Sequence, residues 1–154
     1  MQTTNSRVLI ADGDAVLRRQ LYKRLLDADV FCDCVPDAGS ALRALDERPY
    51  TMVVLDLGLE RADGYNVLDR IRSMTNAERP VVLVTVTQQD SRLLDVELVQ
   101  VVLRKPIRIA EVTDLIRSCL RTIGDDTILR RQRSKRAERS AVIAASTEAE
   151  RTIT

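Results

Sequence analysis

A short apolar stretch that runs into a carboxylate places the strongest constraint on how this chain folds. Residues 52–55 follow a turn signal at Arg48-Pro49 and lead directly into Asp56. Apolar runs of this length are typical of strands buried on both faces, as in a parallel sheet between layers of helices. Chemistry collects at the carboxyl ends of such strands. Asp56 is therefore a candidate nucleophile or metal ligand, and the alternative is an acidic residue that only opens a loop.

Other apolar stretches also end on a polar side chain. Residues 7–11 lead into Asp12, residues 81–84 into Thr85 and residues 99–103 into Lys105-Pro106, and one further strand is expected at 30–35. Between them, apolar residues recur at helical spacing in 15–28, 38–45, 67–73 and 109–123. Strands and helices that alternate through short connections predict a parallel α/β sheet with right-handed crossovers.

Local signals set the ends of the predicted helices. Asp14 is a suitable N-cap for the helix that starts at Ala15. Gly124 is expected to stop the last helix. Residues 88–97 have no clear period, and at most a short helix is expected around Leu93 and Leu94.

Composition bounds the class of protein. The 154 residues, with 24 basic and 23 acidic side chains, suit one domain with an appendage. No apolar run approaches the roughly 20 residues of a membrane span, and residues 1–7 hold no signal-peptide core, so a cytoplasmic location away from the membrane is expected. With three cysteines (Cys32, Cys34 and Cys119) and no histidine, a structural zinc site is not expected, and the cysteines are interpreted as small core residues.

Residues 125–154 differ in character from residues 1–124. Six basic residues and one acidic residue lie from Arg130 to Arg139, and the stretch beyond has no periodic apolar face and no aromatics. We expect a solvated segment that is disordered or partly helical, and docking to nucleic acid, acidic lipid or protein is the alternative. Thirty polar residues cannot build a helix-turn-helix core, so no DNA-binding domain is expected.

The strand ends form one chemical set. A parallel sheet would bring Asp12, Asp56, Thr85 and Lys105 to the same edge. Two carboxylates can hold a divalent cation while one of them attacks phosphorus, and a hydroxyl and an ammonium can bind the phosphoryl oxygens. Oxygen ligands with retained waters suit Mg²⁺.

From about Arg7 to Thr122 the chain resembles the receiver domain of two-component response regulators, the CheY-like superfamily. Asp56 matches the phosphoacceptor, Thr85 the switch hydroxyl and Lys105-Pro106 the lysine with its often cis proline. Asp12 matches the first residue of the acidic pair, and Asp63-Gly64 follows Asp56 at the family's distance. The resemblance implies a doubly wound, flavodoxin-like five-stranded parallel sheet of order 2-1-3-4-5 with helices on both faces. It also implies Mg²⁺ held by Asp12, Asp56 and the main-chain carbonyl of Gly58.

Several residues depart from the family pattern. Gly13 occupies the second acidic position, so weak Mg²⁺ binding is expected unless Asp14 reaches round as a ligand. Glu60 stands where a proline is usual, Val86 replaces a small residue and Val102 replaces the aromatic switch residue.

The predicted function is a stand-alone receiver that accepts a phosphoryl group on Asp56 from a histidine kinase or phosphotransfer protein. It would signal to a protein effector, or form a homodimer, through the face made by the last two helices and the last strand. It is not expected to be an enzyme beyond self-catalysed phosphoryl transfer and dephosphorylation.

Two alternatives remain open at the level of sequence. The first is a degenerate receiver that binds proteins independently of phosphorylation, which Gly13, Val86 and Val102 favour. The second is a haloacid-dehalogenase-like phosphatase, suggested by Asp12-Gly13-Asp14. Asp125-Asp126, its possible later acidic pair, follows a predicted helix rather than a strand, and the chain has no room for a cap.

Overall fold

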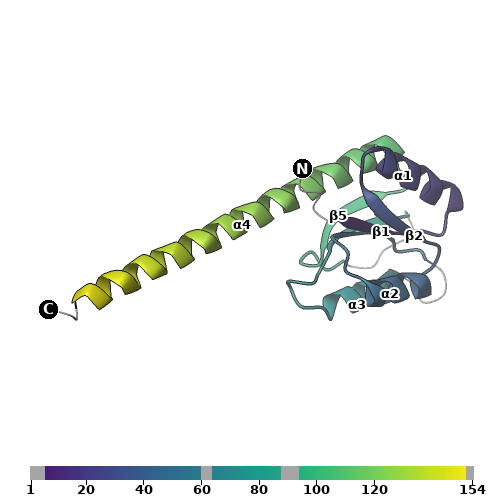
Figure 1. Cartoon of the computed structure of the whole chain (residues 1–154). Coiled ribbons are helices and arrows are strands. Elements are labelled where there is room, and N and C mark those ends of the chain that lie inside the picture. The colour runs from purple at the N-terminus through teal and green to yellow at the C-terminus, as the bar shows by residue number, and fades with distance from the viewer. Residues whose placement is uncertain (1–5, 60–63, 88–93, 152–154) are drawn as a thin grey trace. The chain divides into compact units, whose positions relative to one another are not determined.

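One five-stranded parallel sheet organises the first part of the molecule (Figure 1). The computed structural model describes residues 6–59, 64–87 and 94–151, with side chains omitted at 127, 128 and 143–151. The strands are β1 (Arg7–Ala11), β2 (Phe31–Val35), β3 (Met52–Asp56), β4 (Val81–Val86) and β5 (Val99–Arg104), in the order β2-β1-β3-β4-β5. The predicted doubly wound architecture and strand order are confirmed.

Helices cover both faces of the sheet. They are α1 (Ala15–Asp27), α2 (Ala38–Glu47), α3 (Gly64–Arg72) and α4 (Ile109–Arg151). The helix α1 and residues 109–117 of α4 lie on one face, and α2 and α3 lie on the other (Figure 1). This arrangement leaves the carboxyl ends of the strands free of helices, so polar side chains at those ends can form a site.

The central strands are buried on both sides, as their continuous apolar sequence predicts. All five residues of β3 are buried, and successive side chains alternate between the two helix layers. On the face of α2 and α3, Leu55 belongs to a core cluster that includes Ala41 and Val67. Full burial of one such aliphatic side chain stabilises the fold by about 1.5–3 kcal/mol, so the core holds the strand ends in register.

The start of α1 shows how a local signal fixes an element. The Asp14 Oδ1 atom accepts hydrogen bonds from the main-chain N–H groups of Val16 (2.9 Å) and Leu17 (3.2 Å). These two donors have no partner inside the helix, so the carboxylate satisfies them. The predicted N-cap is confirmed.

The predicted end of the last helix is wrong. The helix α4 continues through Gly124 to Arg151. A glycine inside a helix costs only about 1 kcal/mol relative to alanine, and the helix-forming residues around it outweigh that cost. The chain divides into two compact units, Met1–Arg117 and Ser118–Thr154, whereas the division at residue 124 stays a prediction.

Two smaller expectations have mixed outcomes. The predicted short helix around Leu93 and Leu94 falls partly on residues 88–93, which lie outside the described residues, and residues 94–98 hold a turn instead. All three cysteines are free, but only Cys32 is a core residue, because Cys34 and Cys119 are half-buried. Within the described residues, no helix combines the length and apolar character needed to cross a membrane.

Candidate functional site

Four polar side chains meet at the carboxyl edge of the sheet. Asp12 follows β1, Asp56 ends β3, Thr85 lies in β4 and Lys105 follows β5. Asp56 and Thr85 are direct neighbours in the register between β3 and β4. The exposed fractions of Asp12, Asp56 and Thr85 are only 3%, 8% and 1%. Because buried polar groups are costly without partners, each needs a specific interaction.

Lys105 bridges the two carboxylates. Its Nζ atom lies 2.9 Å from Asp12 Oδ2 and 2.9 Å from Asp56 Oδ2. Burial alone would lower the pKa of Lys105, but the hydrogen bonds and negative charges of the two carboxylates outweigh it, and the pKa is raised. The ammonium is therefore held charged between the two acids. The peptide bond from Lys105 to Pro106 is cis.

The other oxygen of each carboxylate accepts a main-chain hydrogen bond. Asp12 Oδ1 accepts from the N–H of Asp14 at 2.9 Å, and Asp56 Oδ1 accepts from the N–H of Gly58 at 2.9 Å. Both side chains are thus fixed in orientation before any ligand arrives.

Thr85 differs from its neighbours. Its Oγ1 atom is fully buried and finds no hydrogen-bond partner in the part of the chain that the structure describes. A buried hydroxyl left unsatisfied costs about 1–3 kcal/mol. A ligand oxygen placed beside Asp56 would give this donor a partner.

A cavity of about 480 Å³ opens at this edge. Its lining residues are Asp12, Gly13, Asp14, Pro36, Asp37, Asp56, Gly58, Leu59 and Lys105. All predicted site residues therefore line the cavity except Thr85, which is buried beside Asp56. The cavity is rich in carboxylates, so it suits a cation and the oxygens bound to that cation.

The donor set fits Mg²⁺. The Asp12 and Asp56 carboxylates lie close together, since both contact the Lys105 ammonium, and Gly58 lines the same cavity. Among the described residues, no group of three cysteine or acidic side chains is arranged to hold a metal ion. Two carboxylates leave several positions for water and ligand oxygens, which is how proteins usually bind Mg²⁺.

Gly13 leaves space where the resembled family has a carboxylate. A Cβ atom built on Gly13 would meet only the Pro36 carbonyl oxygen, at 3.9 Å. Gly13 has no positive φ, so no special backbone conformation requires glycine here. The nearby Asp14 carboxylate uses its Oδ1 atom to cap α1. Its predicted role as a possible metal ligand stays a prediction.

Two contributors to the site were missed by sequence reasoning. The Arg18 guanidinium donates to the main-chain oxygen of Asp12 at 2.7 Å, a contact between a helix and a strand end that no local pattern signals. Gly64 was recognised only as part of the Asp63-Gly64 pair that follows Asp56, and its packing against the strand end was not predicted. A Cβ atom there would lie 2.7 Å from the Asp56 carbonyl oxygen and 2.8 Å from Leu57 Cα, so α3 packs directly beneath the acid.

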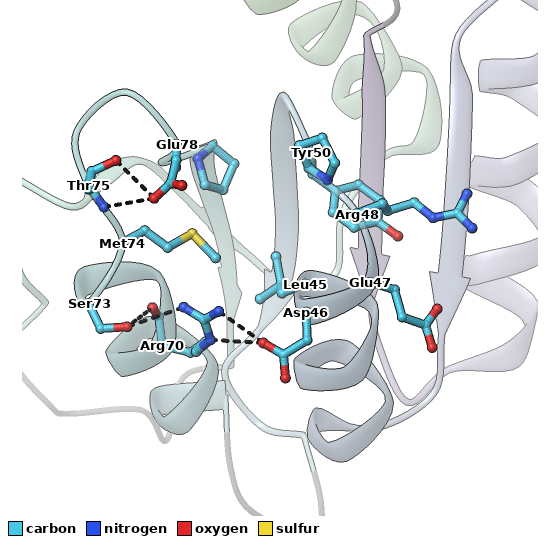
Figure 2. Close-up of a pocket in the computed structure, with 12 residues that line it drawn as sticks. Leu45, Asp46, Glu47, Arg48, Tyr50, Arg70, Ser73, Met74, Thr75 and Glu78 are labelled. Carbon is cyan, nitrogen blue, oxygen red and sulfur yellow. Dashed lines mark hydrogen bonds and ion pairs between the residues drawn. The ribbon is translucent and has the colours of Figure 1, made fainter.

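A second hollow, of about 410 Å³, lies at the opposite edge of the sheet, between the ends of α2 and α3 (Figure 2). Arg70 donates two hydrogen bonds to Asp46 Oδ1, at 2.9 and 3.1 Å, and Thr75 donates to Glu78. These side chains already pair with one another. The hollow therefore lacks a group of polar side chains that converge on one point, as the side chains around Asp56 do.

The comparisons with known proteins agree with this geometry. The family model of the response regulator receiver domain matches residues 8–117. The chain belongs to this family. It holds a receiver domain of two-component signalling, and this domain belongs to a signalling family rather than an enzyme family.

Individual relatives share the receiver region only. The two-component response regulator PhoP of Pseudomonas aeruginosa is 33% identical over 79 residues, which cover 51% of this chain and 35% of that protein. The transcriptional regulatory protein PmrA of Pectobacterium parmentieri is 30% identical over 117 residues, covering 75% of this chain and 52% of PmrA. The chain thus spans about half, or less, of the length of these relatives.

A solved structure shares the fold. The CheY-like receiver domain from Methylobacillus flagellatus superposes with a TM-score of 0.63, at 22% identity, covering 74% of this chain and 98% of that one.

Proposed function

We propose that this receiver accepts a phosphoryl group on Asp56 from a histidine kinase or phosphotransfer protein, and signals through protein–protein contacts. The observation that carries the proposal is the grouping of three side chains: the buried Asp56 carboxylate, the Lys105 ammonium at 2.9 Å and the unsatisfied Thr85 hydroxyl. A nucleophile beside two donors suits an incoming group with several anionic oxygens.

The reaction follows from these positions. An Asp56 oxygen attacks the phosphorus of a phosphohistidine on the donor protein. The oxygen–phosphorus bond forms as the nitrogen–phosphorus bond breaks, and the imidazole leaves with the electron pair and takes up a proton. Lys105 Nζ and Thr85 Oγ1 donate to the oxygens of the transferred group, which gives the Thr85 hydroxyl its missing partner.

Asp12, Asp56 and the carbonyl of Gly58 would hold Mg²⁺ in this site. When bound, the cation supplies positive charge that offsets the repulsion between the carboxylates and the phosphoryl oxygens. Lys105 holds both carboxylates in position, and so preserves their orientation for metal and substrate.

The proposal is tested with acetyl phosphate and Mg²⁺ on the full chain, followed by intact mass and Phos-tag mobility. Wild type should gain one phosphoryl group, and Asp56→Asn should gain none. Asp46→Asn is the matched control, because Asp46 is an exposed aspartate paired with Arg70 in the opposite hollow; it should label like wild type. Labelling that survives Asp56→Asn would sink the assignment.

A degenerate receiver is the second candidate. Gly13 offers no ligand at its position, Val86 is buried beside Thr85, and Val102 is too small to act as an aromatic switch. This candidate predicts a folded wild-type protein that stays unmodified by acetyl phosphate and by phosphorylated kinase. The phosphatase alternative gains no support, because Asp125 and Asp126 lie inside α4 and not at a strand end.

A further inference from the structure

The helix α4 carries a dense group of basic side chains. From Leu129 to Val142 every side chain is exposed. Six of these residues are basic and one, Glu138, is acidic. The sequence alone suggested a solvated segment, but the structure holds these charges on a continuous helix. Their spacing is therefore fixed, and like charges three and four residues apart repel each other by a few tenths of a kcal/mol per pair.

The basic residues form two stripes. Arg131, Lys135 and Arg139 recur every four residues, and Arg130, Arg133 and Arg136 recur every three. With 3.6 residues per turn, the two stripes lie about 160° apart around the helix. We call these six residues the double basic stripe. A single flat anionic surface could reach only one side of it.

One strip of surface between the two stripes holds two small side chains and one acidic side chain. At about 100° per residue, Ser134, Ala141 and Glu138 lie near the midline between the stripes, whereas Ala137 falls within the stripe of Arg130, Arg133 and Arg136. Small residues let a helix backbone approach another surface closely. The helix therefore presents a narrow strip with one acidic side chain, Glu138, flanked on both sides by cations.

We propose that the double basic stripe binds the phosphate backbones of double-stranded DNA, with the helix lying in the major groove. That groove is about 12 Å wide, accepts a helix of about 10–12 Å diameter and has phosphates along both walls. Two opposed cationic stripes match two opposed anionic walls. This inference goes beyond phosphoryl acceptance and does not depend on it.

Other polyanions match less well. The major groove of RNA duplexes is too narrow for a helix, and single strands are bound through aromatic side chains, which α4 lacks. A membrane-surface helix needs one apolar face opposite one charged face, and the stripes occupy both sides. Contacts to phosphates carry no sequence information, so the binding is independent of sequence and differs from that of a helix-turn-helix domain.

The test is fluorescence anisotropy of the full chain with a labelled duplex of about 20 base pairs, from about 50 to 200 mM salt. If all six cations contact phosphates, log K should fall with log salt with a slope of about −5. Arg131→Gln/Lys135→Gln/Arg139→Gln should reduce that slope by about 3 and weaken binding at least about tenfold at about 100 mM salt. Glutamine is a good helix former, and circular dichroism checks that the helix is retained.

The control removes the same charges elsewhere. Arg19→Gln/Lys23→Gln/Arg24→Gln takes two arginines and one lysine from the exposed surface of α1, and should change affinity less than about threefold. A second variant, Arg131→Lys/Arg139→Lys, keeps the charge and should retain binding.

Four outcomes would overturn the inference. The first two are that the chain does not bind the duplex at about 50 mM salt, and that the α1 control loses as much affinity as the α4 variant. The other two are that single-stranded DNA binds as tightly as the duplex, and that the chain binds phosphatidylserine vesicles but not the duplex. The last outcome would assign the double basic stripe to membrane surfaces instead.

Discussion

At the residue scale, the Thr85 hydroxyl is expected to lower the stability of the fold and to speed phosphorylation. Because Oγ1 is buried without a partner, replacing it with a methyl group removes a desolvation cost. Thr85→Val should therefore raise the free energy of unfolding by about 1 kcal/mol. The same change should slow phosphorylation by acetyl phosphate about tenfold, because one donor to the phosphoryl group is lost.

Thr113 provides the matched control for this prediction. It is equally buried, but its hydroxyl donates to the Ile109 carbonyl oxygen at 2.7 Å. Thr113→Val should lower the free energy of unfolding by about 1 kcal/mol and leave phosphorylation unchanged. Urea unfolding of both variants checks the signs. If Thr85→Val destabilises the protein as Thr113→Val does, the Thr85 hydroxyl has a partner after all.

Gly13 sets the strength of the metal site. The space beside Gly13 is open, so Gly13→Asp adds a carboxylate without a clash. An extra anionic ligand in a partly solvated site should tighten Mg²⁺ binding by roughly ten- to several-hundredfold. Isothermal titration and the rate of phosphorylation both report this gain.

Asp14 is the residue that could contradict the prediction for Gly13. Asp14→Ser keeps an N-cap for α1 but removes the carboxylate, so it should leave Mg²⁺ affinity within about twofold. If Asp14→Ser weakens binding strongly, Asp14 already supplies the missing ligand. Gly13→Asp would then bring little gain.

At the scale of elements, the approach of α3 to β3 fixes Asp56. Gly64→Ala would place a Cβ atom 2.7 Å from the Asp56 carbonyl oxygen. Because backbone must move, the substitution should destabilise the receiver by about 1–3 kcal/mol and slow phosphorylation.

Gly39→Ala in α2 is the control for this clash. Its Cβ atom would make only an ordinary contact, 3.4 Å from the Asp37 side chain, so the substitution should be neutral or stabilising by up to about 1 kcal/mol. Chemical unfolding and labelling rates are compared for the two variants. Equal stability of the two would show that α3 can shift without cost.

Elements with one dominant signal could be predicted from the sequence. The buried strand β3 needs a short apolar run, and the start of α1 needs a cap at Asp14; both signals are local. The continuation of α4 could not be predicted, because the cost of Gly124 is about 1 kcal/mol and neighbouring residues outweigh it. Contacts between distant elements, such as Arg18 with Asp12, carry no local signal at all.

The same contrast holds within the site. The order of polar residues after the strands predicted which side chains share the carboxyl edge. It could not predict that Lys105 would bridge both acids at 2.9 Å, or that Thr85 would lack a partner. Those features depend on the register between β3 and β4 and on side-chain packing, which become defined only in the folded sheet.

At the scale of the whole molecule, charge is distributed unevenly along the chain. Residues 1–124 carry 17 basic and 18 acidic side chains, and residues 125–154 carry 7 and 5. The net charge of the chain is only +1, so it gives no general attraction to polyanions. Binding to DNA therefore depends on the local arrangement of the double basic stripe.

Each edge of the sheet holds a titratable group whose loss of a proton at high pH is expected to lower the stability of the fold. Lys105 lies between two carboxylates at the carboxyl edge. At the amino edge, Tyr50 is buried and donates to Asp33 Oδ2 at 2.7 Å, and Arg7 pairs with the same carboxylate. Burial, then the hydrogen bond and charge of Asp33, raise the pKa of Tyr50.

Both groups therefore bind their proton more tightly in the folded protein than in the unfolded chain. Their contribution to stability is fully present below about pH 10 and is lost as the pH rises through the folded pKa values. The free energy of unfolding of wild type should fall above about pH 10, by up to about 1.4 kcal/mol per pH unit for each group. Tyr50→Phe and Lys105→Met should each make this fall shallower.

The two variants differ at neutral pH, which tells their roles apart. Tyr50→Phe removes one hydrogen bond, while Arg7 still pairs with Asp33, and should cost about 1 kcal/mol. Lys105→Met leaves two buried carboxylates without their shared cation and should cost about 3–5 kcal/mol. Urea unfolding from about pH 7 to 11 measures both effects. A Tyr50→Phe curve that runs parallel to wild type above about pH 10 would show that the pKa of Tyr50 is not raised in the folded protein, and that the alkaline loss comes from the Lys105 edge of the sheet.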